Sequence, residues 1–303
     1  MAQPALTSPE RVAGGRIGPL HVRSLRDGLG VAGLLFAGYL FAVAAPTYQT
    51  VGFDAVAYWG VDLEHPYRSV AGDLGAFPYT PVAARLFAPT GLIDWIAFWW
   101  LWEGILVGTI VWLGWRRALL VLAFPPVAVE LYHGNVHLLI AAAVALGLRY
   151  PAAWAFVLLT KVTPGIGLVW FAVRREWRNL AIALGVTVAL VMVSLVVDGR
   201  LWIEWLNEAI LPAAGRPLGQ PSIPIPLAIR LPAALIVVIW GALTDRRWAL
   251  PVAVTLALPI MWFAGLSILV AIPAIQRPEL SGQPDPAAVP AAATTATSAA
   301  AGR

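Results

Sequence analysis

The chain has 303 residues, of which 60% are hydrophobic and only 12% are charged. A soluble domain of that composition lacks the polar residues needed to cover its surface, so the sequence predicts an integral membrane protein. The net charge of +4 comes mainly from arginines in short loops beside apolar segments, which indicates topology signals and not a nucleic-acid surface. The absence of cysteine excludes disulfides and cysteine-based metal sites.

Residues 1–26 contain arginines but no apolar core with a small-residue cleavage site, so we expect a cytoplasmic N-terminal segment and no removable signal peptide. Residues 27–275 are predicted to form the transmembrane domain, with about 8–10 helices, some of them short or broken, in an all-α polytopic fold. Its strongest apolar runs are close to the ~20 residues that a spanning helix needs. These runs are Asp27–Ala45, Leu92–Gly114, Asn179–Val197 and Trp248–Ile272.

Residues 46–91 are predicted to form an extracytoplasmic loop between the first two spans. Its centre gathers four acids, a histidine, an arginine and three tyrosines: Asp54, Asp62, Glu64, Asp73, His65, Arg68, Tyr58, Tyr67 and Tyr79. Asp54 follows the outer end of the first span, where a general base needs only to reach an acceptor hydroxyl. The alternative is that Asp54 is a solvated loop acid, and that alternative is stronger for the other three carboxylates.

Residues 152–173 form either one helix or two short helices that meet at Thr160–Pro164. One helix would place the arginines of residues 174–178 outside, against the positive-inside rule, and Pro164 favours a break. We therefore prefer the broken hairpin, whose free backbone groups must be buried in protein or line a wet cavity. Lys161, the only lysine of the chain, lies at the break. It either neutralises a lipid phosphate or extends to the membrane interface as a structural residue.

Other polar residues carry weaker signals. Glu103 and Glu130 lie in or near apolar spans, where they need a partner or hold an acceptor sugar. His65 among loop acids, and His133 with His137 across a turn, are weak patterns for a metal. The sequence therefore indicates no metal site and no cofactor, and leaves a divalent-cation requirement open.

Two further segments complete the chain. Residues 201–211 are predicted to be a helix at the membrane interface, with a connecting loop as the alternative. Residues 276–303 are rich in Ala, Pro and Thr and are predicted to be a disordered tail, because such a composition cannot bury a core.

Four short motifs occur in a characteristic order: Asp54 with Tyr58, Tyr67 followed by Phe77–Pro81, Gly134–His137, and Lys161–Pro164 followed by Arg174–Arg178. In these motifs the chain resembles the polyprenol-phosphate-sugar-dependent glycosyltransferases of the C superfamily, and most closely the glycosyltransferase 87 family of bacterial mannosyltransferases. Thr80 stands where that family has the first proline of Phe-x-Tyr-Pro-Pro. Asn135 and His137 stand where it has the Gln and Asn of Gly-Gln-x-Asn.

The resemblance implies that Asp54 is catalytic and that a hexose, with mannose as first candidate, moves with inversion from a polyprenyl-phosphate donor to a cell-envelope glycolipid or glycan. Lys161 is the first candidate to hold the donor phosphate, with Arg68 and Arg85 as further candidates. The active site would lie on the extracytoplasmic side of the cell membrane, with the N-terminus cytoplasmic and no nucleic-acid partner. The candidates for substrate binding are Tyr58, Tyr67, Tyr79, Asn135 and His137.

Two functions of other classes stay open. A non-catalytic membrane protein that binds or translocates a polyprenyl-phosphate lipid would use the same cation but would not need Asp54. An ion or solute transporter is disfavoured, because the sequence shows no paired inverted halves and only one convincing broken helix pair.

Overall fold

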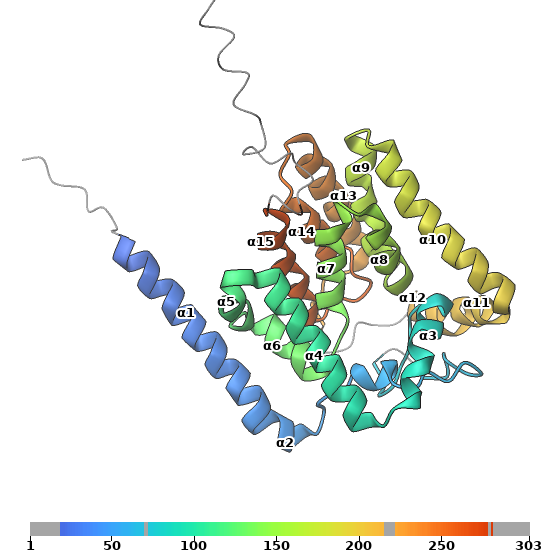
Figure 1. The fold of residues 1–303 in the computed structure, drawn as a ribbon, viewed down its shortest axis with the longest axis horizontal. Helices are drawn as coiled ribbons and strands as arrows, with labels where there is room; N and C mark the ends of the chain where they lie inside the picture. Colours follow the sequence, from blue (N-terminus) through green and yellow to red (C-terminus); the bar gives the residue numbers. More distant parts are fainter. Residues whose placement is uncertain (1–18, 70–71, 215–221, 278–279, 281–303) are drawn as a thin grey trace, which may run out of the picture.

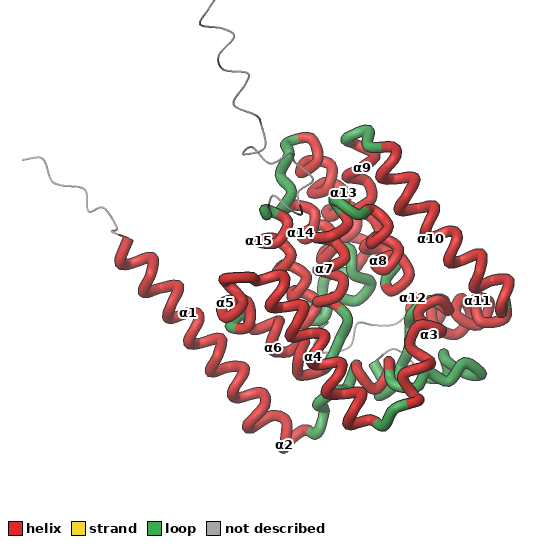
Figure 2. Tube along the Cα trace, in the orientation of Figure 1, coloured by secondary structure: helices red, strands yellow, loops and turns green. Residues whose placement is uncertain are grey.

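The computed structural model describes residues 19–69, 72–214, 222–277 and 280. Helices make up 75% of the structure, and the described residues form no strand, only an isolated bridge between Ser222 and Trp262 (Figure 2). The predicted all-α membrane fold is confirmed. The N-terminal segment up to residue 18 and the predicted tail from residue 281 lie outside the described residues.

Three helical segments are long and apolar enough to cross a membrane: Asp27–Tyr48, Trp95–Leu122 and Trp177–Asp198. Much of their apolar surface is uncovered by protein, with Leu35 70% and Val196 84% exposed. Apolar side chains exposed along a whole helix are typical of a surface that faces lipid. The helical elements that make up these three segments are α1 (Pro19–Tyr39), η1 (Leu40–Ala44), α2 (Ala45–Tyr48), α4 (Trp95–Gly114), η4 (Trp115–Arg117), α5 (Ala118–Leu122) and α10 (Trp177–Asp198).

Helices α6 (Pro125–His133) and α7 (His137–Gly147) form a fourth candidate span, bent by 117° at the turn between them. The remaining apolar helices are shorter, and α13 (Leu227–Leu243), with 17 residues, is about 25 Å long against a hydrocarbon layer of about 30 Å. The structure thus has three to four candidate spans together with short apolar helices, where the sequence predicts about 8–10 helices, some short or broken.

The predicted span Trp248–Ile272 is not a single helix. Helix α14 (Ala249–Leu256) ends shortly before Pro259, which cannot continue a helix, and η8 (Phe263–Val270) and α15 (Ala271–Ile275) follow a loop. The buried guanidinium of Arg230 in α13 donates hydrogen bonds to the carbonyls of Leu256, Leu258 and Pro259 at 2.7, 2.7 and 3.1 Å. These bonds satisfy carbonyl groups that the end of α14 leaves without helical partners.

Helix α1 stands to one side of the molecule and packs mainly on α5 and α6 (Figure 1). It crosses them at Gly33, where an added Cβ would lie 1.6 Å from the carbonyl oxygen of Ala123. The two backbones therefore touch, and only glycine fits between them.

The broken hairpin predicted at Thr160–Pro164 is present. Its arms are η5 (Pro151–Ala153) with α8 (Trp154–Thr160), and η6 (Thr163–Leu168) with α9 (Val169–Val173). Trp154 packs on Gly167, and Leu158 packs on Gly165, so the arms run antiparallel. This reversal places Lys161 at the tip of the hairpin.

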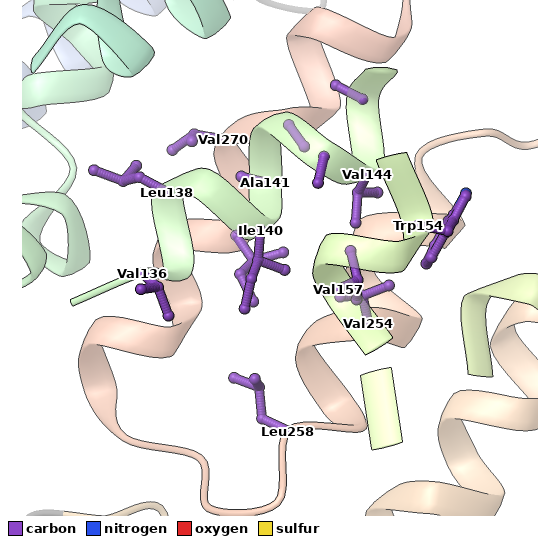
Figure 3. Packing of buried hydrophobic residues seen from close by; sticks show 14 of the residues in the cluster. Val136, Leu138, Ile140, Ala141, Val144, Trp154, Val157, Val254, Leu258 and Val270 are labelled. Carbon is purple, nitrogen blue, oxygen red and sulfur yellow. The ribbon is translucent and has the colours of Figure 1, made fainter. Parts of the chain in front are cut away.

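The core lies around α7, where α7, α8, α14 and η8 meet. The side chains labelled in Figure 3 are aliphatic except for that of Trp154. In Figure 3, Val136 and Ile140 lie beside the hairpin arm that carries Val157, and Leu258 lies below them. The same packing therefore holds the α6–α7 turn and the Lys161 hairpin in one rigid unit.

The loop of residues 46–91 lies at one end of the molecule and contains η2 (Ala55–Tyr58), α3 (Pro81–Phe87) and η3 (Ala88–Leu92) (Figure 1). The predicted helix at 201–211 is hydrogen-bonded to this loop. It is present as α11 (Arg200–Glu204), η7 (Trp205–Ile210) and α12 (Leu211–Ala214). Arg200 donates to the carbonyls of Leu63 and Glu64 at 3.1 and 2.9 Å. The α9–α10 and α13–α14 turns lie at the opposite end (Figure 1) and are joined by a 2.8 Å ion pair of Arg174 with Asp245.

Candidate active site

Asp54 lies in the turn between α2 and η2, and the chain there is bound to the C-terminal end of α6. The backbone N–H of Asp54 donates to the carbonyl of His133 at 3.0 Å, and that of Gly52 donates to Tyr132 at 2.9 Å. Carbonyls in the last turn of a helix have no partner within the helix and are free to accept these bonds. A segment that follows the first span is thereby joined to the α6–α7 turn.

Asn135, in that turn, holds the Asp54 carboxylate. Its Oδ1 accepts the backbone N–H of Val136 at 2.7 Å and, at 3.4 Å, the hydroxyl of Tyr58. Because Oδ1 is occupied in this way, the amide N–H₂ is free to donate the side-chain hydrogen bond that Asp54 accepts.

The half-buried Asp54 carboxyl is a stronger base than an ordinary aspartate. Burial raises its pKa above the usual 3.8, while the hydrogen bond from Asn135 and the nearby His133 oppose that rise. The opposing effects leave a carboxylate that accepts a proton more readily than a solvated loop acid does.

Tyr58 and Tyr79 form a buried pair next to Asp54. Their hydroxyl oxygens are 2.6 Å apart, and the Tyr58 ring stacks on Phe87 with centroids 4.9 Å apart. Burial raises the pKa of both tyrosines well above 10, so both remain neutral hydroxyl groups. The pair links the short helix that follows Asp54 to the segment that precedes α3.

Lys161 lies over the Tyr79 ring of this pair. Its Nζ lies 5.2 Å from the centroid of the Tyr79 ring, and its charge interacts with the carboxylates of Asp54 and Glu130. Thr80 donates to the carbonyl of Leu159 at 2.5 Å, which joins the 46–91 loop to the hairpin. The proline that the family motif has at this position could not make that bond.

The three other candidates of the 46–91 loop are Arg68, Arg85 and Tyr67. Arg68 is exposed and pairs with Asp62 at 3.6 Å, and Arg85 pairs with Asp198 at 3.5 Å. Tyr67 is buried and lies within electrostatic reach of Glu204. The structure thus pairs the two arginines with acids other than Asp54 and leaves the buried Tyr67 hydroxyl without a hydrogen-bond partner among the described residues.

His137 lies beneath the α6–α7 turn. Its ring is completely buried, and Nδ1 is 2.9 Å from Oε2 of Glu130. Within the described part of the chain, no group of three or more His, Asp or Glu residues could hold a metal ion, so neither His133 with His137 nor His65 belongs to such a cluster.

The sequence matches the model of glycosyltransferase family 87 over residues 77–297, which is most of the chain. The chain belongs to this family. Neither the curated proteins nor the solved structures contain a significant match to it.

This family 87 protein is therefore a membrane glycosyltransferase. The matched region contains Tyr79, Asn135 and Lys161, whereas Asp54 and Tyr58 precede it. Asp54 and Tyr58 are connected to the matched region by the hydrogen bonds with Asn135 and Tyr79 described above.

Sequence reasoning missed two roles in this family 87 site. Substrate binding by Asn135 stays a prediction, and the structure adds the hydrogen bond from its amide to Asp54; the sequence could not separate the roles of Glu130. The sequence did contain a signal for Glu130. It lies seven residues before His137 within one apolar hairpin, and the structure pairs these two residues.

Proposed function

We propose that this family 87 glycosyltransferase moves a hexose, with mannose as the first candidate, from a polyprenyl-phosphate donor to a glycolipid or glycan acceptor of the cell envelope. The observation that carries the proposal is that Asp54 and Lys161 both lie at the Tyr58–Tyr79 pair, close enough for their charges to interact. A displacement at a sugar carbon needs a base for the attacking hydroxyl and a cation for the leaving phosphate. Asp54 and Lys161 can supply these two groups.

In this reaction the acceptor oxygen forms a bond to the anomeric carbon while Asp54 takes the proton of the acceptor hydroxyl. The bond from the anomeric carbon to the phosphate oxygen breaks, and the electron pair leaves with the polyprenyl phosphate. Attack opposite to the leaving group inverts the configuration. Lys161 stabilises the charge that grows on the departing phosphate, and so favours the transition state over the bound donor.

The proposed orientation has the N-terminus in the cytoplasm and Asp54 on the outer side of the cell membrane. In its support, the basic turns at 174–178 and 245–247 lie together at the end opposite the 46–91 loop (Figure 1). Because the chain has no cysteine, single-cysteine labelling is free of background. Asp73→Cys should react with an impermeant maleimide in whole cells and Arg246→Cys only after lysis; the reverse pattern would overturn the orientation.

The activity is tested with Asp54→Asn and Lys161→Ala in membranes supplied with radiolabelled lipid-linked mannose. Asp62→Asn is the matched control, because Asp62 is an exposed acid of the same loop that pairs with Arg68. We expect transfer to fall by a factor of about 10² or more in the Asp54 variant and to persist in the control. Retained transfer in Asp54→Asn would remove the base assignment, and donor binding without transfer by the unaltered protein would favour a lipid-binding function.

A further inference from the structure

Glu130 of α6 organises the turn that carries Asn135. It is completely buried, and its Oε1 accepts the backbone N–H groups of His137 and Leu138 at 2.6 and 3.3 Å. Its own carbonyl accepts the N–H groups of Gly134 and Asn135 at 2.8 and 3.3 Å. One residue thus receives hydrogen bonds from four of the five residues between 134 and 138.

The carboxylate replaces a cap that α7 lacks. Val136 precedes the first residue of α7 and offers no side-chain hydrogen bond to the free N–H groups there. The Glu130 Oε1 at that position satisfies two of those groups. In a buried setting such bonds are stronger than in water, so they define the position of the turn closely.

The turn transmits this position to Asp54. Gly134 has φ of 68° and packs so closely on η2 that an added Cβ would lie 2.8 Å from Cβ of Ala55, and its carbonyl accepts the indole N–H of Trp102 at 2.7 Å. The next residue, Asn135, donates to Asp54. A shift of Glu130 would therefore move the Asn135 donor relative to Asp54.

We propose that Glu130 is a positioning residue for catalysis, which holds Asn135, and through it Asp54, by capping α7 from within α6. The inference rests on the proposed function of Asp54. It assigns to Glu130 a role that depends on the reach of its side chain and not on its negative charge.

Two substitutions distinguish a role that depends on the length of the Glu130 side chain from a role that depends on its negative charge. Glu130→Gln keeps one oxygen for the backbone N–H groups of His137 and Leu138, and its amide can donate to Nδ1 of His137 in the other neutral tautomer. Glu130→Asp keeps the carboxyl group but is one methylene shorter, so it cannot cap α7 in the same way. We expect Glu130→Gln to keep kcat within about threefold, and Glu130→Asp to lower kcat about 10-fold to 100-fold with the donor KM within about twofold.

A double-mutant cycle with Asn135→Ala tests the path of the effect. If Glu130 acts through Asn135, Glu130→Asp should lower kcat no further in the Asn135→Ala background. Thermal unfolding of the purified variants shows which are folded, and kcat is expressed per folded protein. An active Glu130→Asp beside an inactive Glu130→Gln, or equal losses in both backgrounds, would overturn the inference.

Asp54→Asn measured in parallel keeps the two proposals apart. If Asp54→Asn retains transfer, the proposed base is wrong whatever the Glu130 variants do. If Asp54→Asn is inactive and the cycle is additive, only the positioning role of Glu130 fails.

Discussion

The hydroxyl oxygens of Tyr58 and Tyr79 are 2.6 Å apart in a buried aromatic cluster. Tyr58 belongs to the short helix η2 that follows Asp54. Tyr79 precedes the helix α3, and Nζ of Lys161 lies over its ring. This single contact therefore joins the base side of the site to the cation side.

The two tyrosines should respond differently to loss of the hydroxyl. In Tyr79→Phe the Tyr58 hydroxyl still reaches Asn135 Oδ1, whereas in Tyr58→Phe the Tyr79 hydroxyl stays buried without its partner. We expect Tyr58→Phe to reduce the free energy of unfolding by about 1–3 kcal/mol and Tyr79→Phe by less. Thermal unfolding of the purified variants measures this, and the reverse order would contradict the hydrogen-bond arrangement.

Removal of the Lys161 charge should weaken donor use. Lys161→Ala should lower kcat/KM for the lipid-linked donor by a factor of about 10² to 10³, because the leaving phosphate loses its cation. Arg116→Ala, the loss of one positive charge at an exposed position, is the control. Steady-state kinetics in detergent check this, and equal effects of the two variants would show that overall charge is responsible.

The acid limb of the pH profile, where kcat/KM decreases at low pH, should reflect the protonation of Asp54. Burial raises the pKa of Asp54, and the protonated acid cannot accept a proton, so kcat/KM should fall as the pH drops through a value above 3.8. The hydrogen bond from Asn135 opposes that rise. Asn135→Ala should therefore move the acid limb to higher pH; a limb that stays in place or moves lower would show that Asn135 does not stabilise the carboxylate.

The ionised Asp54 carboxylate should also reduce the stability of the folded protein at neutral pH. A carboxyl with a raised pKa binds its proton more tightly in the folded chain than in the unfolded chain, so stability falls as the pH rises from the unfolded pKa through the folded one. Asp54→Asn removes the desolvated charge and should unfold at a higher temperature than the unaltered enzyme at neutral pH. At a pH below the unfolded pKa of Asp54 the two proteins should unfold at similar temperatures.

The crossing of α1 should depend on Gly33. An added methyl group there would collide with the Ala123 carbonyl, so Gly33→Ala should reduce stability by at least about 1–3 kcal/mol. Gly38→Ala, in the same helix but with no heavy atom within 4 Å of the added Cβ, should be neutral or slightly stabilising. Thermal unfolding compares the pair, and equal behaviour would exclude the close contact.

Local sequence signals predicted much of this fold. Long apolar runs predicted the spans at 27–45 and 179–197, and Pro164 with the arginines that follow predicted the hairpin at Lys161. They did not predict the break in Trp248–Ile272. Pro259 is a local signal for that break, but the helix end is stabilised by Arg230, a partner so distant along the chain that no local pattern indicates it.

The sequence by itself determined that the chain is a helical membrane protein, that Asp54 follows the first span in a polar loop, and that its only lysine lies at a helix break. These features depend on composition and on neighbouring residues, which act locally. Only the tertiary structure decided which polar groups meet: Asn135 with Asp54, Tyr79 with Lys161, and Glu130 with the start of α7. Each of these contacts joins separate elements, and their distances follow from the packing of the helices around α7 and not from spacing along the chain.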